Sequence, residues 1–365
     1  MNNPGQESVI CIHPVVEERG RIKDDNETVF TVSLKDCLAC SGCAITEDEI
    51  TLLSHQDPTK ILQAIKENPG FSVIISTSVL ANLAAAKQWS IQKAFGSMSF
   101  FFLSLGASQV VHDGFWQIVW RNLLIDEFKK AKITKPFIIS RCPGAVLFFE
   151  RKTKNANHLA PIKPFPQLYA LHSKNDIKKP PYVLNVAPCY DRKLETGRFK
   201  GDIDGTISVG EISSMIQESD EIETFPFPND NDAIYMVRKL SGYKEVEVKE
   251  AGHVIEYTCG NLKGALICGE ASLRRLSANI DRNNCQYDIV EADFCPGSCS
   301  TGGGLIRGSN PSKRKLLVQQ TIDMHKSFEN EQVYESEVGN VVETLKKLQI
   351  KAEYASVETN DDFQF

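Results

Sequence analysis

The 365-residue sequence lacks the features that mark membrane, secreted and nucleic-acid-binding proteins. No apolar run approaches the roughly 18 residues of a membrane-spanning helix, and residues 1–7 are polar, unlike a secretory signal. The formal charge is -6, and the lysines are scattered along the chain. Such a chain offers no positive field to phosphate backbones. We therefore expect a protein of the cytosol or nucleus that binds neither membranes nor nucleic acid.

Cysteine, by contrast, is abundant, with 11 residues. In a reducing compartment a high cysteine count indicates metal binding or redox chemistry rather than disulfides. Hydrophobic residues make up 42% of the chain, which is enough to fill the cores of two ordinary lobes. The positions of the cysteines within the expected fold therefore decide between the possible chemistries.

Apolar periodicity predicts β/α winding over most of the chain. A strand-like run at residues 71–76 precedes a helical pattern at residues 79–94, and the same alternation recurs further along. This predicts an α/β fold with two β/α lobes and mostly parallel sheets. The expected parts are a small N-terminal cluster-binding module (1–55), a first lobe (56–178), a second lobe (179–350) and an acidic C-terminal tail (351–365).

Three cysteines lie close together in the N-terminal segment. Cys37, Cys40 and Cys43 have C-x2-C-x2-C spacing, with which one short loop can supply three thiolates to a four-iron cluster. A fourth ligand must come from elsewhere, and Cys11 is the nearest upstream candidate. Zinc sites also use C-x2-C pairs. We favour iron-sulfur because three cysteines in one continuous run are too crowded for paired zinc knuckles.

Four further cysteines each lie at or just beyond the end of an expected strand: Cys142, Cys189, Cys295 and Cys299. The ends of parallel strands meet at one edge of a sheet, so these thiolates could converge between the lobes. A glycine run at residues 302–304 would let the backbone approach a bulky inorganic group. Each cysteine alone could equally be a buried packing residue. We prefer that interpretation for Cys259, Cys268 and Cys285, which have no motif around them.

At these residues the sequence resembles the iron-only hydrogenase-like proteins, in the cytosolic iron-sulfur assembly factor branch that includes nuclear prelamin A recognition factor-like proteins. The matching segments are CIHP (11–14), DCLACSGC (36–43), RCPG (141–144), APCYDRKLE (187–195) and CPGSCSTGGG (295–304).

The resemblance implies two 4Fe-4S clusters as cofactors. The first would be held by Cys11, Cys37, Cys40 and Cys43, and the second by Cys142, Cys189, Cys295 and Cys299. It also implies an iron-only hydrogenase-like arrangement of the lobes and a cytoplasmic location that extends to the nucleus. The implied partners are proteins of the cytosolic iron-sulfur assembly scaffold and the targeting complex.

Several residues depart from the pattern of active hydrogenases. Those enzymes have a proton-donating cysteine just before the first C-terminal ligand, where this chain has Arg141. Arginine stays protonated near neutral pH and cannot relay protons. Arg192 replaces a typical lysine, Leu305 replaces a frequent glutamine, and Phe365 stands where the family usually has a tryptophan that docks a partner.

These departures favour a non-catalytic assembly factor that helps transfer clusters to cytosolic and nuclear apoproteins. An iron-only hydrogenase or related redox enzyme is the alternative function. A zinc-stabilised interaction protein, in which the cysteines only staple loops together, is the third interpretation.

Overall fold

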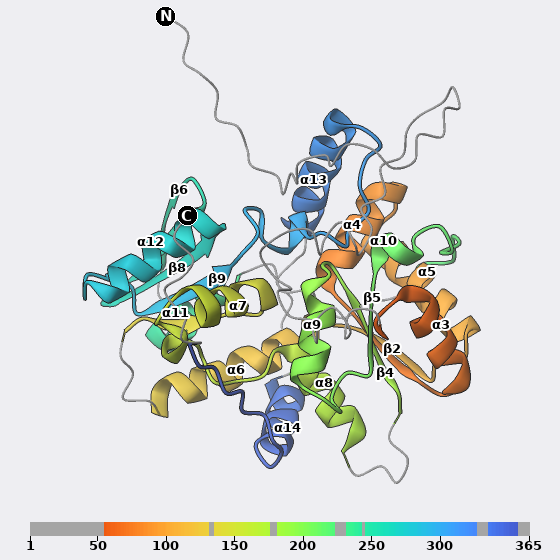
Figure 1. Cartoon of the computed structure of the whole chain (residues 1–365), viewed down its shortest axis with the longest axis horizontal. Helices are drawn as coiled ribbons and strands as arrows, with labels where there is room; N and C mark the ends of the chain where they lie inside the picture. Colours follow the sequence, from red (N-terminus) through yellow and green to blue (C-terminus); the bar gives the residue numbers. More distant parts are fainter. Residues whose placement is uncertain are drawn as a thin grey trace, which may run out of the picture.

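Two β-sheets with helices packed against them form the body of the molecule (Figure 1). The computed structural model describes residues 55–130, 135–175, 181–222, 231–242, 245–326 and 335–356. Within these ranges no helix has both the length and the apolar character needed to cross a membrane. The expected N-terminal module, apart from its last residue, lies outside the described residues.

Sheet A contains four parallel strands in the order β2-β1-β4-β5. All residues of β1, β4 and β5 are buried, as in parallel sheets covered on both faces. Helices α3, α4 and α5 pack on one face, and α6 and α8 on the other. The bounds are β1 (Ser72–Ile75), β2 (Gln109–His112), β4 (Val183–Ala187), β5 (Gly205–Ser208), α3 (Pro58–Glu67), α4 (Thr77–Lys87), α5 (Ile91–Ser104), α6 (Gly114–Lys130) and α8 (Phe165–Lys174).

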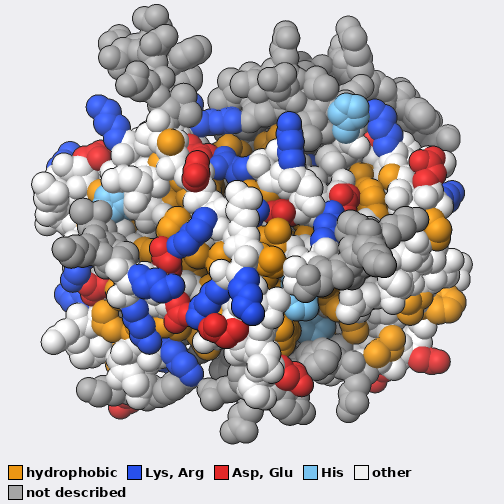
Figure 2. Space-filling view, turned by 90° about the horizontal axis from the view of Figure 1, so that it is seen from below, with side chains coloured by type: hydrophobic (Ala, Val, Ile, Leu, Met, Phe, Trp, Pro, Cys, Tyr) orange, Lys and Arg blue, Asp and Glu red, His pale blue; other side chains and the backbone are white. Residues whose placement is uncertain are grey.

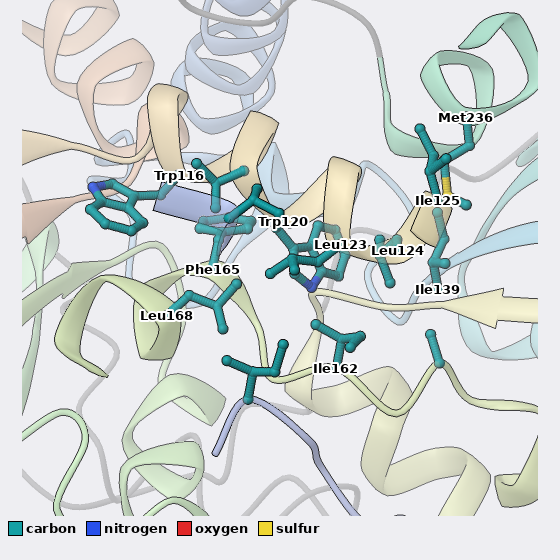
Figure 3. Packing of buried hydrophobic residues seen from close by; sticks show 14 of the residues in the cluster. Trp116, Trp120, Leu123, Leu124, Ile125, Ile139, Ile162, Phe165, Leu168 and Met236 are labelled. Carbon is teal, nitrogen blue, oxygen red and sulfur yellow. The ribbon is translucent and has the colours of Figure 1, made fainter. Parts of the chain in front are cut away.

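Aromatic side chains of α6 and α8 fill the space beneath sheet A (Figure 3). The rings of Trp120 and Phe165 meet edge to face with their centroids 5.8 Å apart, and those of Trp116 and Tyr169 with centroids 5.3 Å apart. Edge-to-face contacts of this kind add to the stabilisation that comes from burial alone. The carboxyl ends of the strands are thereby held against a rigid layer of helices.

Sheet B has the strand order β3-β9-β8-β7-β6 and is mixed. β3, β9 and β8 run parallel, whereas β7 and β6 add an antiparallel ribbon at the edge. Helices α7 and α12 cover one face, and α11 packs on the other. The bounds are β3 (Phe137–Ile139), β6 (Glu247–Ala251), β7 (Val254–Cys259), β8 (Leu262–Cys268), β9 (Ile289–Asp293), α7 (Pro143–Lys152), α11 (Asp232–Ser241) and α12 (Glu270–Asp281).

The expected α/β fold with mostly parallel sheets is confirmed, but the sheets do not follow the order of the chain. β3 pairs with β9 in sheet B, while β4 and β5, which follow β3, lie in sheet A. Strands of both sheets therefore lie on each side of residue 178. The remaining elements are α9 (Asp191–Arg198), α10 (Val209–Ile212), α13 (Pro311–Lys326), α14 (Glu335–Leu345) and the 3-10 turns Ala156–His158 and Ser298–Thr301.

The helix expected at residues 79–94 is two helices, α4 and α5. Gln88 ends α4 in the left-handed conformation with φ 57°, and the hydroxyl of Ser90 then accepts a hydrogen bond from Lys93 N at 3.0 Å to cap α5. An N-cap serine of this kind starts a new helix axis. The apolar period continues across the break, because both helices pack on the same face of sheet A.

The start of the expected acidic tail is packed against the body. Lys351 forms an ion pair with Glu127 at 2.5 Å, and Ala352 N donates to the carbonyl of Pro161 at 3.2 Å. Phe365 lies outside the described residues. On the face seen from below, basic side chains stand among acidic ones (Figure 2), and Lys346 likewise pairs with Asp126 at 2.8 Å.

Candidate metal centre

The four C-terminal candidate ligands come together between the two sheets. Cys142 follows β3, Cys189 follows β4, and Cys295 and Cys299 both follow β9. The other three thiols contribute to raising the pKa of Cys295, which indicates that the four groups lie near one another. All four are free thiols. Cys11, Cys37, Cys40 and Cys43 lie outside the described residues.

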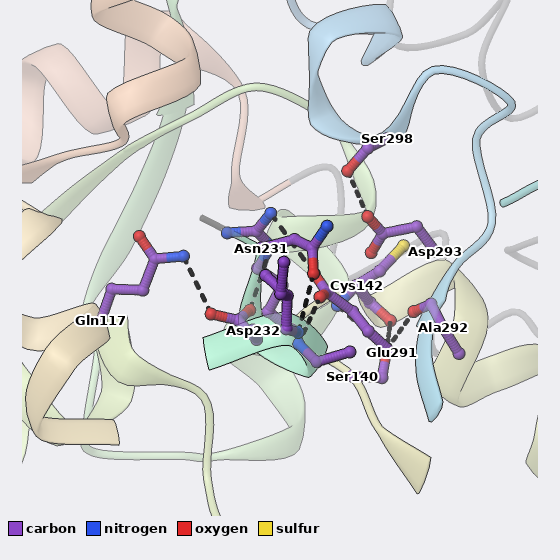
Figure 4. Close-up of polar contacts among 12 residues, drawn as sticks. Gln117, Ser140, Cys142, Asn231, Asp232, Glu291, Ala292, Asp293 and Ser298 are labelled. Atoms are coloured by element: carbon purple, nitrogen blue, oxygen red, sulfur yellow. Dashed lines mark hydrogen bonds and ion pairs between the residues drawn. The ribbon is translucent and has the colours of Figure 1, made fainter. Parts of the chain in front are cut away.

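Hydrogen bonds at the strand ends hold Cys142 in place (Figure 4). Ser140 Oγ donates to the carbonyl of Ala292 at 2.8 Å and accepts from Cys142 N at 3.2 Å, which fastens the end of β3 to β9. Cys142 is the N-cap residue of α7, and Pro143 follows at the start of the helix. Proline is tolerated there because the first N–H groups of a helix have no partner within the helix. The Cys142 sulfur accepts from Phe294 N at 3.5 Å. These contacts fix Cys142 at the junction between β3 and α7.

A tight turn presents Cys295 and Cys299. Ser298 N donates to the carbonyl of Cys295 at 3.1 Å, and Ser298 has φ 54°, in the left-handed region that side chains rarely adopt. The Ser298 hydroxyl donates to a carboxylate oxygen of Asp293, which helps to hold this strained turn (Figure 4). Strain of this size persists where the surroundings fix the backbone, and such places are often functional.

The glycine run allows close contacts between neighbouring segments of the chain. A Cβ on Gly302 would lie 2.3 Å from the carbonyl oxygen of Pro188, and one on Gly304 would lie 2.6 Å from Ser208 Cβ. Gly304 N also donates to the Pro188 carbonyl at 3.0 Å. The atoms approached by these two glycines belong to the loop before Cys189 and to β5. The run therefore brings the loop of Cys299 against that of Cys189.

The protein environment disfavours bare thiolates at this site. Burial raises the pKa of Cys142, Cys189 and Cys295. Burial and the charge of Asp293 raise the pKa of Cys299 to about 11, although two arginines oppose that rise. Since metal ligation requires thiolates, binding of a metal group here must displace protons.

Two arginines face Cys299. They are Arg141, which precedes Cys142, and Arg192, in the first turn of α9. Arg192 Nη1 donates to Glu195 Oε2 at 2.6 Å, and its Nη2 donates to the carbonyl of Arg141. Arg141 Nε lies 3.7 Å from Asp232 Oδ2, and its Nη2 lies 3.6 Å from Glu291 Oε1.

Asp232 and Glu291 (Figure 4) are both buried, and both lie within ion-pair distance of Arg141. Asp232 Oδ1 accepts from Arg121 Nε at 2.6 Å and from Gln117 Nε2 at 3.1 Å. Glu291 Oε2 accepts from Ala233 N at 3.0 Å. Burial and the charge of Asp232 raise the pKa of Glu291 to about 8, despite the opposing charge of Arg141.

A small pocket opens beside Cys299 at the carboxyl ends of β1 and β4. The polar residues that line it include Ser76, Asp113, Arg141, Asn185 and Arg192. Within the described ranges no three His, Cys, Asp or Glu side chains are close enough together to hold one metal ion. The four thiols are therefore spaced more widely than the ligands of a single ion. A cluster with four thiolate ligands does not need such a close group, because each thiolate binds a different iron.

Cys268 is predicted from the sequence to be a buried packing residue, which is confirmed, but its position near this site is not predicted. Cys268 ends β8, where it is paired with Asp293 of β9, and it is influenced by the charges of Cys142 and Cys299. It is buried. A thiol at the end of a parallel strand can be expected near the site, but the sequence analysis predicts no strand at β8, so this argument could not be applied to Cys268. Asp232 was missed as well, since an acidic residue in the first turn of a helix is ordinary.

Comparison with known proteins identifies similar proteins named for iron-sulfur chemistry. Residues 70–234 match the family model described as "Iron only hydrogenase large subunit, C-terminal domain". A probable cytosolic Fe-S cluster assembly factor of Brugia malayi is 26% identical over 379 residues, covering 90% of this chain and 84% of that protein. The cytosolic Fe-S cluster assembly factor narfl of Xenopus tropicalis is 26% identical over 427 residues, covering 92% and 88%.

The fold also matches solved structures. An FeFe-hydrogenase variant from Chlamydomonas reinhardtii superposes with a TM-score of 0.64 at 13% identity, covering 85% of this chain and 98% of the enzyme. At this identity the likeness concerns the fold, which is the hydrogenase-like arrangement expected from the sequence. Together with the partial family match and the assembly-factor relatives, it means that the chain is similar to the iron-only hydrogenase-like proteins and, among them, to cytosolic iron-sulfur cluster assembly factors.

Proposed function

We propose that this chain is a non-catalytic iron-sulfur cluster assembly factor that holds two 4Fe-4S clusters and helps to transfer clusters to cytosolic and nuclear apoproteins. The observation that carries the proposal is the meeting of four free thiols from three strand ends, beside an arginine. Four thiolates are the ligand set of a four-iron cluster. The second cluster would be held by Cys142, Cys189, Cys295 and Cys299.

The first cluster would be held by Cys11, Cys37, Cys40 and Cys43. Support for this site comes from the sequence spacing alone. In this proposal the module of residues 1–55 carries the first cluster, while lobes of residues 56–178 and 179–350 enclose the second. A cluster enclosed between lobes would exchange slowly, and one held by a single short loop would be easier to release.

The absence of catalysis is proposed from Arg141. Its guanidinium lies beside Cys299, where hydrogen chemistry needs a group that gives and takes protons. Arginine keeps its proton near neutral pH, so it provides fixed charge instead. The relatives are named assembly factors rather than hydrogenases, which also supports this part of the proposal.

The partners are proposed from the names of the relatives. Those names describe cytosolic iron-sulfur assembly components, so this chain would work in the cytosol with the assembly scaffold and a targeting complex. Delivery to nuclear apoproteins would extend its location to the nucleus. If depletion of the protein left cytosolic iron-sulfur enzymes fully loaded, this role would be wrong.

The ligand assignment is tested by anaerobic purification of the wild type and of Cys299→Ala, with iron and sulfide measured per monomer. We expect about eight irons in the wild type and roughly half of that in the variant, since each four-iron cluster needs its thiolates. Cys268→Ala is a demanding control, because this thiol is buried next to the site and is not one of the proposed ligands. Zinc with little iron in the wild type would overturn the proposal.

One observation favours an alternative, an iron-only hydrogenase or related redox enzyme. A small pocket lined by polar side chains lies beside Cys299, at the place where a further group would have to bind next to the cluster. Hydrogen evolution from a reduced dye would establish this function and reject the non-catalytic one. We expect the wild type to evolve hydrogen no faster than the Cys299→Ala variant.

A further inference from the structure

Arg141 has buried polar groups around it that form no hydrogen bonds. Among the described residues, Arg141 Nε, Asp232 Oδ2 and Glu291 Oε1 are all buried and make none. The separations of 3.6 and 3.7 Å are ion-pair distances, too long for good hydrogen bonds. A buried donor without an acceptor costs about 1–3 kcal/mol. The guanidinium of Arg141, which lines the pocket beside Cys299, therefore has a donor that forms no hydrogen bond.

The two carboxylates within ion-pair distance of Arg141 do not fully neutralise it. Asp232 is engaged by Arg121, whose Nε lies 2.6 Å from Oδ1. Glu291, whose pKa is raised to about 8 by burial and by Asp232, carries little negative charge near neutral pH. The positive charge of Arg141, which acts on Cys299, is thus only partly neutralised.

Arg192 fixes the position of this charge. Its side chain is only 5% exposed and lies between Glu195 and the carbonyl of Arg141, to both of which it donates. The segment before Cys142 is thereby tied to α9, which follows Cys189. Loops that carry two of the proposed ligands are joined through one guanidinium.

We propose that Arg141 supplies the counter-charge to the second cluster near Cys299, and that Arg192 is the positioning residue that holds Arg141 in place. This inference rests on the proposed function. A four-thiolate cluster is net negative, and its sulfur atoms accept hydrogen bonds of the kind that Arg141 Nε lacks. Nearby positive charge and hydrogen bonds to sulfur raise the reduction potential of such clusters. They also oppose loss of the cluster from a buried site.

The test compares Arg141→Gln and Arg141→Lys in a Cys40→Ala background, which removes a ligand of the first site. The midpoint potential of the remaining cluster is measured by paramagnetic resonance, and the rate at which iron is released to a chelator is measured separately. Arg141→Gln should lower the midpoint potential and speed release several-fold, because charge and donor are lost together. Arg141→Lys should keep the potential close to that of the Cys40→Ala parent, since the charge remains.

Arg198→Gln is the matched control, because Arg198 also belongs to α9 and pairs with Glu150 instead. It should leave both readings unchanged. If Arg141→Gln had the potential and release rate of the Cys40→Ala parent, the inference would be wrong. If the parent held no iron, the proposed function itself would fail first. Should Arg141→Gln not fold, Arg192→Lys keeps the charge of residue 192 but loses the guanidinium that joins Glu195 to the Arg141 carbonyl. A lowered potential in that variant would still support the inference, and an unchanged potential and release rate there would reject it.

Discussion

Lys193 Nζ donates to the backbone carbonyl of Gln56 at 2.7 Å. Lys193 belongs to α9, just after Cys189, and Gln56 lies near the first described residue of the chain. The same ammonium pairs with Glu211 Oε1 at 2.7 Å, and its side chain is fully buried. Gln56 Oε1 in turn accepts from Thr206 N at 2.8 Å. The segment that leads out of the N-terminal module is therefore fixed to the loop of a proposed second-cluster ligand.

Lys193→Met should destabilise the protein by about 3 kcal/mol, the lower end for breaking a buried ion pair. The cost is at the lower end because Glu211 keeps its capping-box bonds to Ser208 N and Oγ. Urea denaturation followed by circular dichroism measures the change. Lys200→Met, at an exposed position two residues beyond α9, should cost less than about 0.5 kcal/mol. Equal stability of the two variants would show that the buried contact is not needed.

Gly302→Ala should separate the loops of Cys189 and Cys299. Its new Cβ would lie 2.3 Å from the carbonyl oxygen of Pro188, so the backbone must move, at a cost of about 1–3 kcal/mol. We expect loss of iron from the second site, measured per monomer after anaerobic purification. Gly303→Ala is the control, since its Cβ would meet nothing closer than 3.6 Å. Normal iron content in Gly302→Ala would show that the contact is dispensable.

The sequence predicted elements that depend on local pattern. β1 and the helix after it were found because a short β-branched run and an apolar period identify them without distant contacts. The pairing of β3 with β9 could not be predicted, because Phe137 and Ile289 are far apart in the chain and nothing local specifies their register. The ribbon of β6 and β7 was missed for a related reason, since every residue of β6 is exposed.

The candidate site was predictable to the extent that strand ends converge. That rule brought Cys142, Cys189 and Cys299 into one group, and the structure has them as electrostatic neighbours. The partners of Arg141 could not be predicted, because Asp232 reaches the site from a helix on the far side of sheet B. Buried ion pairs of this kind are set by tertiary packing.

Asp232→Asn should destabilise the fold strongly. Asp232 is fully buried and accepts from Arg121 Nε at 2.6 Å, so the substitution leaves a buried guanidinium without its counter-charge. Breaking such a pair costs about 3–5 kcal/mol. The control is Asp126→Asn, which affects a half-exposed pair with Lys346 and should cost no more than about 1 kcal/mol. Thermal melting of both variants provides the comparison, and similar melting temperatures would contradict the expectation.

Glu291 should make the stability of the cluster-free protein depend on pH. Burial and the charge of Asp232 raise its pKa from 4.5 to about 8, so between these values the folded state binds a proton that the unfolded state has lost. Its contribution to the free energy of unfolding is therefore fully present below pH 4.5 and falls as pH rises toward 8, by a few kcal/mol at most. Urea midpoints measured from about pH 5 to 8 test this. Glu291→Gln keeps an acceptor for Ala233 N but cannot titrate, so its midpoints should fall less steeply. Parallel pH profiles for the two proteins would show that Glu291 titrates normally in the folded state.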